Sequence, residues 1–334
     1  MTTNTRGKII EYITRHQQAR VHDLHKALLL STAAIHRQLK KLLQAGTILR
    51  VGKPPLVFYT LPPATEAAQT QAHGSLPVDA QKIIETHFLS VTPDGKLLYG
   101  TEGFNYWATL YQKNRQTNEL AQEYITVIKE QRALFSRYGW IDATSKLETT
   151  YNDTYVNHLL FQDLYSYKTF GRTKLAKLVM YAKQIGAKPL IDEISAMAKP
   201  FIEKIIKTYS IDAVAYIPPT VPRPIQFIDE FSTQLHLPLP NIVLTKVTPG
   251  DIPIPQKTLS TVRERIVNAR DSIYLKNSAE TSYANILLLD DVAGSGASFN
   301  EVAKKLKAVG VGHKTIVAFA LVGNIKGYEV IREI

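Results

Sequence analysis

The sequence predicts a multidomain protein with an α+β N-terminal domain, a helical middle region and a C-terminal α/β domain built on a mainly parallel sheet. The chain has 334 residues, 45% of them apolar, which is enough for several domains with their own cores. Helical and then strand periodicity fills the first 62 residues, and an apolar strand, a small-residue loop and a helix follow one another near the C-terminus. The expected divisions are an N-terminal domain at 1–62, a linker at 63–77, a hairpin with helices at 78–185 and the α/β domain at 186–334.

The N-terminal domain is expected to contain three helices followed by a strand hairpin. Apolar residues recur with helical spacing in three segments, 7–15, 21–29 and 32–44. Ser31 is suited to begin the third helix, because a serine hydroxyl accepts a hydrogen bond from a backbone N–H of the first turn. Two strand-like runs, 48–51 and 56–61, are separated by Gly and Pro residues, which predicts a hairpin with a short tip.

Positive charge is concentrated in this N-terminal domain. The formal net charge of the chain is +11. Residues 1–62 hold ten Lys or Arg and two acidic residues, a net charge of +8, which leaves +3 for residues 63–334. This imbalance indicates a polyanionic partner, and a solvated surface is the alternative interpretation.

The order of these elements, with the run 42–50 leading from the third helix into the first strand, resembles a winged helix-turn-helix domain. The resemblance implies that the third helix enters the major groove of DNA and that the hairpin reaches backbone phosphates. A dimerisation or protein-docking module is the alternative. The DNA-binding candidates, on the helix face opposite the apolar stripe and on the hairpin, are Thr32, Ala33, His36, Arg37, Lys40, Arg50 and Lys53.

The linker and the middle region show fewer chemical signals. Residues 63–77 are rich in Pro, Ala, Thr, Gln and Gly and lack apolar periodicity, which predicts a linker. A hairpin is expected from 87–91 and 96–100, around a turn that contains Pro93 and Gly95. Long helical patterns rich in aromatic residues follow at 103–138 and 155–184. We expect these aromatic residues to pack in a core, and stacking on a base or against a second subunit is the alternative.

The most informative motif lies at residues 285–298, where an apolar strand, two adjacent carboxylates and a loop of small residues lead into a helix. Small side chains let backbone N–H groups approach an anion, and the following helix adds the positive end of its dipole. Ser295 and Ser298 add hydroxyl donors, and Asp290 and Asp291 stand where ribose hydroxyls or a metal ion would bind. The motif predicts a sugar-phosphate site, with an ordinary strand-to-helix connection as the alternative.

This motif resembles the phosphoribosyl pyrophosphate (PRPP) motif of type I phosphoribosyltransferases, although Gly294 and Ser295 stand where many members carry two threonines. The resemblance covers roughly residues 190–334 and implies that the domain binds PRPP together with Mg²⁺. Asp290 and Asp291 are the catalytic candidates, because carboxylates stabilise the positive charge that develops on the ribose, and also the metal candidates, directly or through water. The 5′-phosphate loop would be Ala293, Gly294, Ser295, Gly296, Ala297 and Ser298.

A second loop is expected at the same edge of the sheet. An amphipathic helix over 195–209 leads to a strand over 213–217, which would end beside the strand of the PRPP motif. Residues 255–268 resemble the competence-protein-F-like branch of the family, which has a Gln, a Leu-Ser, a Glu-Arg and an Asn in this order, whereas 223–227 is a degraded form of another family stretch. From the resemblance and from their charge, the pyrophosphate candidates are Pro219, Thr220, Arg223, Lys257, Arg263 and Arg265. Each basic residue could equally be a solvated charge.

Two functions fit these expectations. The first is transfer of ribose-5-phosphate from PRPP to a base or amine, with release of pyrophosphate. The second is a PRPP-sensing transcriptional regulator without catalytic turnover, because bacterial purine-operon repressors join a winged helix to a phosphoribosyltransferase-like domain. A third interpretation is a nucleic-acid-linked effector whose helical middle region binds a partner protein.

Composition limits the alternatives further. The chain has no cysteine, which excludes disulfides, cysteine-ligated zinc, iron–sulfur clusters and the cysteine glutaminase needed for glutamine-dependent amination of PRPP. No segment approaches the ~20 apolar residues of a membrane span, and the N-terminus lacks the apolar core of a signal peptide. A cytoplasmic protein without membrane contact is therefore expected, and a homodimer, because both families commonly pair.

Overall fold

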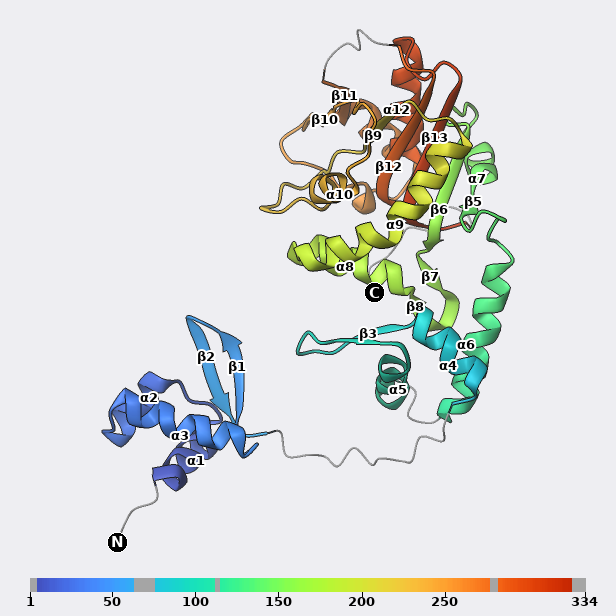
Figure 1. The fold of residues 1–334 in the computed structure, drawn as a ribbon. Coiled ribbons are helices and arrows are strands. Elements are labelled where there is room, and N and C mark those ends of the chain that lie inside the picture. Colours follow the sequence, from blue (N-terminus) through green and yellow to red (C-terminus); the bar gives the residue numbers. More distant parts are fainter. Residues whose placement is uncertain (1–4, 63–75, 112–114, 277–281, 326–334) are drawn as a thin grey trace. The chain divides into compact units, whose positions relative to one another are not determined.

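The structure, a computed structural model, describes residues 5–62, 76–111, 115–276 and 282–325. The chain forms two compact units, Met1–His73 and Gly74–Ile334 (Figure 1). Nearly all of the linker expected at 63–77 lies outside the described residues.

The first unit contains the three helices and the hairpin predicted for it. Its elements are α1 (Thr5–His16), α2 (Val21–Leu28), α3 (Thr32–Gln44), β1 (Leu49–Lys53) and β2 (Leu56–Thr60). The hydroxyl of Ser31 accepts a hydrogen bond from the N–H of Ala34 at 3.3 Å, as the capping argument predicts. All three helices bury apolar residues in one small core, to which Ile9, Leu24 and Ile35 belong.

A five-stranded sheet forms the centre of the second unit. Its strand order is β5-β6-β13-β12-β9, and all neighbours are parallel except the edge strand β5. The strands are β5 (Ile141–Asp142), β6 (His158–Leu164), β13 (Thr315–Gly323), β12 (Asn285–Ala293) and β9 (Ala213–Tyr216). The mixed α/β class with a mostly parallel sheet is therefore confirmed.

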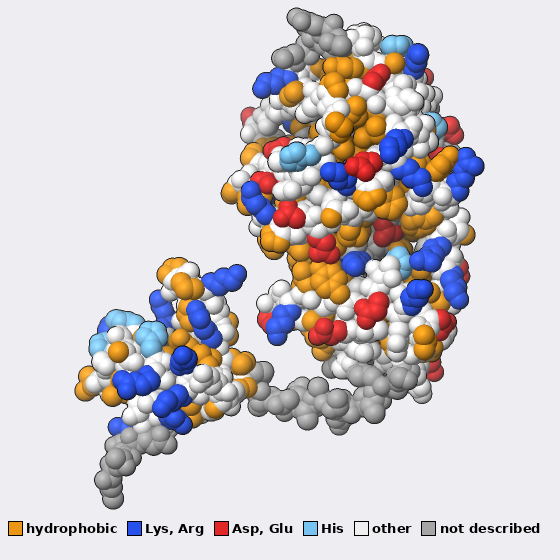
Figure 2. Space-filling model, in the orientation of Figure 1, with side chains coloured by type: hydrophobic (Ala, Val, Ile, Leu, Met, Phe, Trp, Pro, Cys, Tyr) orange, Lys and Arg blue, Asp and Glu red, His pale blue; other side chains and the backbone are white. Residues whose placement is uncertain are grey.

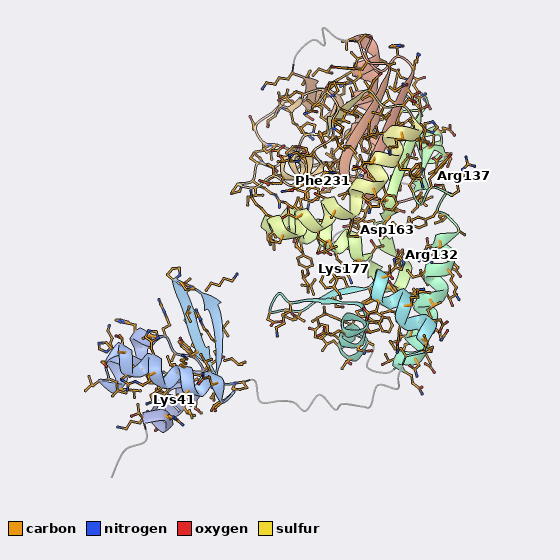
Figure 3. All side chains as sticks on the ribbon, in the orientation of Figure 1. Lys41, Arg132, Arg137, Asp163, Lys177 and Phe231 are labelled. Carbon is orange, nitrogen blue, oxygen red and sulfur yellow. The ribbon has the colours of Figure 1, made fainter. Side chains whose placement is uncertain are left out.

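Helices cover both faces of this sheet, which explains why β12 and β13 are continuous apolar runs. Leu287 and Leu289 of β12 face one core with α8 (Lys174–Ile185), α9 (Lys188–Thr208) and α10 (Phe227–Leu235). Phe231 of α10 is fully buried in that core (Figure 3). The alternate residues Ile286 and Leu288 face the opposite core, which contains α12 (Ala297–Ala308) and the middle helices.

The middle region packs around a cluster of aromatic rings. Its elements are α4 (Val78–His87), β3 (Leu89–Val91), β4 (Leu97–Tyr99), α5 (Gly100–Tyr111), α6 (Thr117–Arg132) and α7 (Thr144–Thr150). The rings of Phe88 and Phe104 lie 5.0 Å apart, and those of Tyr124 and Phe170 lie 5.0 Å apart. Core packing is confirmed for Phe104, Phe161, Tyr167 and Phe170, whereas Tyr111 at the end of α5 is 64% exposed. The hairpin is confirmed, while α4 was not predicted.

The helical pattern predicted at 155–184 is wrong over its first half. Strand β6 occupies 158–164, followed by β7 (Ser166–Tyr167), the short helix η1 (Lys168–Phe170) and β8 (Gly171–Arg172); α8 begins only at Lys174. Because β6 is buried on both faces, its apolar run does not alternate, and periodicity alone cannot separate such a strand from a buried helix. Since β6 pairs with β13, no unit boundary falls at residue 186.

The remaining elements lie between β9 and β12. They are β10 (Leu244–Lys246), the short helix η2 (Gln256–Thr258), α11 (Val262–Ser272) and β11 (Ile273–Leu275), with β10 and β11 paired antiparallel. The expected helix over 195–209 is the second half of α9, and the expected strand over 213–217 is β9.

Candidate functional site

A cavity of about 310 Å³ lies where the parallel strands of the second unit end. Tyr165 follows β6, residues 217–221 follow β9, and residues 290–298 close β12 and open α12; all of them line the cavity. The two loops that the sequence predicted at one sheet edge are therefore brought together. Ligands of open α/β sheets bind at this carboxyl edge.

The loop between β12 and α12 has a left-handed backbone conformation at one position, which favours glycine. Gly296 precedes the first residue of α12 with φ +83°, and a Cβ atom there would lie 2.6 Å from Cδ2 of Leu147. The first N–H groups of a helix have no partner inside it, so the start of α12 presents donors and a positive dipole end to an anion. All six predicted loop residues line the cavity.

The two carboxyl groups of β12 differ in the direction of their pKa shifts. Asp291 is only 6% exposed and pairs with the Lys183 ammonium of α8. Burial alone would raise the pKa of Asp291, but the Lys183 charge and hydrogen bonds hold it below its usual value. For Asp290, burial and the neighbouring Asp291 charge raise the pKa well above its usual value. The pKa values of these neighbouring carboxyl groups are therefore shifted in opposite directions.

These two carboxylates are sufficient to hold a metal ion only when a bound ligand also coordinates the ion. Among the described residues, no three His, Asp or Glu side chains are grouped as metal ligands. Mg²⁺ is usually held by one or two carboxylates plus substrate phosphates, with water completing its octahedral shell. Asp290 and Asp291 match that arrangement, and they are too few for an ion held by the protein alone.

Five basic residues line the cavity: Lys183, Arg223, Lys246, Lys257 and Arg265. Of the predicted pyrophosphate residues, Pro219, Thr220, Arg223, Lys257 and Arg265 line it, whereas Arg263 is exposed on α11 and does not. Lys246, at the end of β10, was not predicted and also lines the cavity. Burial lowers the pKa of Lys246, which the nearby Asp290 partly offsets.

The motif at 255–268 holds Arg265 against the loop 293–298. Thr261 and Glu264 cap α11 reciprocally, and the amide of Gln256 donates to Oδ1 of Asn268 at 3.0 Å. Nε and Nη2 of Arg265 donate to the Leu259 carbonyl at 3.2 and 3.0 Å. Its Nη1 would lie 3.2 Å from a Cβ atom at Gly294, so the buried guanidinium contacts the loop.

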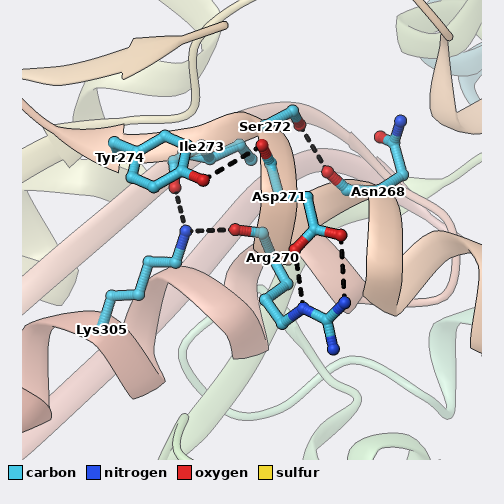
Figure 4. Close-up of polar contacts among 7 residues, drawn as sticks. All are labelled: Asn268, Arg270, Asp271, Ser272, Ile273, Tyr274 and Lys305. Carbon is cyan, nitrogen blue, oxygen red and sulfur yellow. Dashed lines mark hydrogen bonds and ion pairs between the residues drawn. The ribbon is translucent and has the colours of Figure 1, made fainter. Parts of the chain in front are cut away.

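The other end of α11 is fixed to α12 (Figure 4). Nζ of Lys305, on α12, donates to the carbonyl of Arg270 at 2.5 Å and to that of Ile273, and it lies 4.1 Å from the centre of the Tyr274 ring. A cation at a helix C-terminus bonds the carbonyls that have no partner within the helix. Since α12 starts within the loop 293–298, this contact fixes α11, and Arg265 with it, relative to that loop.

Several cavity residues escaped the sequence analysis. Ala176, Val179, Met180 and Lys183 lie at spacings of three, four and seven along α8 and line one wall, beside Tyr165. The helical spacing revealed a buried face, but nothing local indicated that part of this face borders a cavity. Lys183 and Lys246 reach the site only through the tertiary fold, and no motif marks either residue.

The predicted DNA-binding residues lie on the surface of the first unit. Thr32, Ala33, His36, Arg37 and Lys40 are all exposed on α3, opposite the buried Ile35 and Leu39. Arg50 and Lys53 are exposed on β1. Figure 2 shows Lys, Arg and His side chains gathered over this unit, on the face drawn. The surface is thus basic and accessible.

Neither the known protein-family models nor the curated proteins match this chain. In the part of the chain that the structure describes, no helix combines the length and the apolar character needed to cross a bilayer.

Proposed function

We propose that the second unit binds PRPP with Mg²⁺ and transfers its ribose-5-phosphate to a base or amine, releasing pyrophosphate. One observation carries this proposal. Segments 217–221, 255–257 and 290–298, distant in sequence, converge on one cavity at the carboxyl edge of the sheet. They bring a phosphate-binding loop, two carboxylates and several cations within the reach of one ligand.

Each part of the cavity has a role in this reaction. The loop 293–298 holds the 5′-phosphate through backbone donors, and Asp290 and Asp291 face the ribose. The bond between the anomeric carbon and pyrophosphate breaks, pyrophosphate leaves with the electron pair, and an acceptor nitrogen bonds the same carbon and loses a proton. The negative charge of the leaving pyrophosphate is offset by four basic side chains, those of Arg223, Lys246, Lys257 and Arg265. Mg²⁺ bound with PRPP would offset it further.

A PRPP sensor without turnover is the second candidate, and the Lys183–Asp291 ion pair favours it. That pair compensates the carboxylate charge that would stabilise a cationic ribose in the transition state. Binding of PRPP needs only the loop and the cations. We propose that the first unit binds DNA through α3 and β1. In a sensor, PRPP binding to the second unit would control this DNA binding.

Phosphorus NMR distinguishes these candidates. The protein is mixed with Mg-PRPP and a panel of free bases and ammonia. A pyrophosphate signal that grows above the protein-free control and depends on one acceptor supports transfer. Broadened PRPP lines without pyrophosphate support the sensor, and unperturbed PRPP lines would overturn both.

A further inference from the structure

The proposed phosphate loop, residues 293–298, is hydrogen-bonded to a segment that lies outside the region resembling phosphoribosyltransferases. Nζ of Lys146, on α7, donates to the carbonyl of Gly294 at 2.8 Å. The hydroxyl of Tyr151, the residue after α7, donates to the carbonyl of Ser295 at 3.0 Å. Both side chains are buried, at 6% and 8% exposure, and neither residue lines the cavity.

These two hydrogen bonds determine where the loop's N–H groups point. In a planar trans peptide, the carbonyl of one residue and the N–H of the next point in opposite directions. With the carbonyls of Gly294 and Ser295 directed at Lys146 and Tyr151, the N–H groups of Ser295 and Gly296 are directed the other way. Ser295 and Gly296 line the cavity, so their donors face a ligand there.

Further hydrogen bonds join residues 146–155 to the end of β13 and to α12. Lys146 also donates to the carbonyl of Asn324, just beyond β13, and so ties the loop to the neighbouring strand. Asn300 of α12 accepts from the N–H of Tyr155 at 2.8 Å and donates to the carbonyl of Asp153 at 3.0 Å. The loop and the first turn of α12 are thus both bonded to residues 146–155.

We propose that Lys146 and Tyr151 are positioning residues that aim the N–H groups of the loop at a phosphate monoester. The inference rests on the proposed function of the cavity, and it adds residues that the PRPP motif does not contain. Lys146 also places a positive charge behind the loop, which strengthens its attraction for an anion. Pyrophosphate binding should depend little on these two bonds, because Arg223, Lys246 and Lys257, which are proposed to hold pyrophosphate, lie outside the loop.

The test compares four forms of the full chain: wild type, Tyr151→Phe, Lys146→Met and the matched control Tyr155→Phe. Tyr155 lies four residues from Tyr151, and its backbone contact with Asn300 survives the substitution. Calorimetric titrations use ribose 5-phosphate, Mg-pyrophosphate and Mg-PRPP, with urea unfolding as a check on folding. Loss of one hydrogen bond should lower the affinity of Tyr151→Phe for ribose 5-phosphate about threefold to tenfold. Lys146→Met should lose more, at least about tenfold.

The outcome is decided by comparing how each variant changes the affinity for ribose 5-phosphate and the affinity for Mg-pyrophosphate. Weaker binding of ribose 5-phosphate by both variants, with Mg-pyrophosphate and the Tyr155→Phe control within about twofold of wild type, supports the proposal. Equal losses for both ligands, or an unchanged affinity of Tyr151→Phe for ribose 5-phosphate, would overturn it while leaving the proposed function intact. Wild type that binds none of the three ligands would instead overturn the proposed function. If Lys146→Met does not fold, Tyr151→Phe decides alone.

Discussion

At the scale of single residues, Asp290 and Asp291 illustrate how one strand end shifts the pKa of two identical side chains in opposite directions. Against the effect of burial, the Lys183 ammonium and hydrogen bonds hold the pKa of Asp291 below its usual value, while burial and the Asp291 charge raise the pKa of Asp290 well above its own. In the proposed function, the carboxylate of Asp291 can accept a hydrogen bond from a ribose hydroxyl.

Asp291→Asn is expected to weaken Mg-PRPP binding or turnover at least ~tenfold, about 1.4 kcal/mol. The substitution removes the negative charge that is proposed to face the ribose and the metal ion, and it leaves the half-exposed Lys183 without this ion pair. Titration of Mg-PRPP, followed by phosphorus NMR, measures the loss. Asp271→Asn is the control, because Asp271 pairs with Arg270 outside the cavity. Equal affinity and rate in Asp291→Asn and wild type would show that the site is misplaced.

Asp163, on β6, is expected to make stability depend on pH (Figure 3). Burial raises its pKa to about 6, although it accepts hydrogen bonds from the N–H of Leu164 and the hydroxyl of Tyr167. The folded state therefore keeps a proton that the unfolded state releases near pH 4. The bound proton therefore stabilises the folded state fully below pH 4. As pH rises from 4 through 6, this stabilisation is lost, which lowers the free energy of unfolding by up to about 3 kcal/mol.

Urea unfolding of wild type and Asp163→Asn at several pH values measures this contribution. Other groups titrate in the same range, among them His87, whose pKa burial lowers to about 4. The informative quantity is therefore the free energy of unfolding of Asp163→Asn minus that of wild type. This difference should increase as pH rises from 4 to 7. A difference that is independent of pH would contradict the raised pKa.

At the scale of elements, the join between β12 and α12 depends on one glycine. Gly296→Ala would force an L-residue to positive φ and drive its Cβ atom into Leu147, whereas a Cβ atom at Gly310, where φ is +78°, would have no atom within 4 Å. Gly310→Ala therefore measures the backbone strain alone. We expect Gly296→Ala to lower the free energy of unfolding by about 1–3 kcal/mol more than Gly310→Ala does, in urea titrations. Equal losses would mean that Leu147 moves aside freely.

Helix α3 is expected to supply phosphate contacts to DNA. Arg37→Ala and Lys40→Ala should each weaken binding to a random duplex and lower the slope of log affinity against log salt by about 1. Fluorescence anisotropy across a salt series gives both quantities. Arg15→Ala serves as control, since Arg15 pairs with Glu11 on α1. No binding by wild type at low salt would remove the DNA-binding proposal.

At the scale of the whole molecule, charge is divided unequally along the chain. Residues 1–62 carry a net charge of +8 out of +11. A fragment of residues 63–334 should therefore elute from a heparin column at clearly lower salt than the full chain, because the polyanion attracts mainly the first unit. Elution of both at the same salt would show that the second unit has its own polyanion site.

Local signals in the sequence predicted much of the fold, and distant pairing accounts for most of what they missed. Ser31 and the motif at 285–298 depend on neighbouring residues, and the structure has the expected elements at both. The parallel pairing of β6 with β13 leaves no local signature, so the first half of 155–184 was predicted to be helical. Lys183 and Lys246 reached the cavity unnoticed for the same reason, since only the tertiary fold brings them there.

The sheet order has a consequence for synthesis on the ribosome. Strand β13 lies between β6 and β12 although it comes after both in the chain. Until residues 315–323 emerge, the nascent chain holds two apolar strands whose facing edges lack their partner, and such edges pair readily with other chains. We expect the second unit to complete its folding only after β13 is released, so that chaperone binding to the growing chain should persist until then.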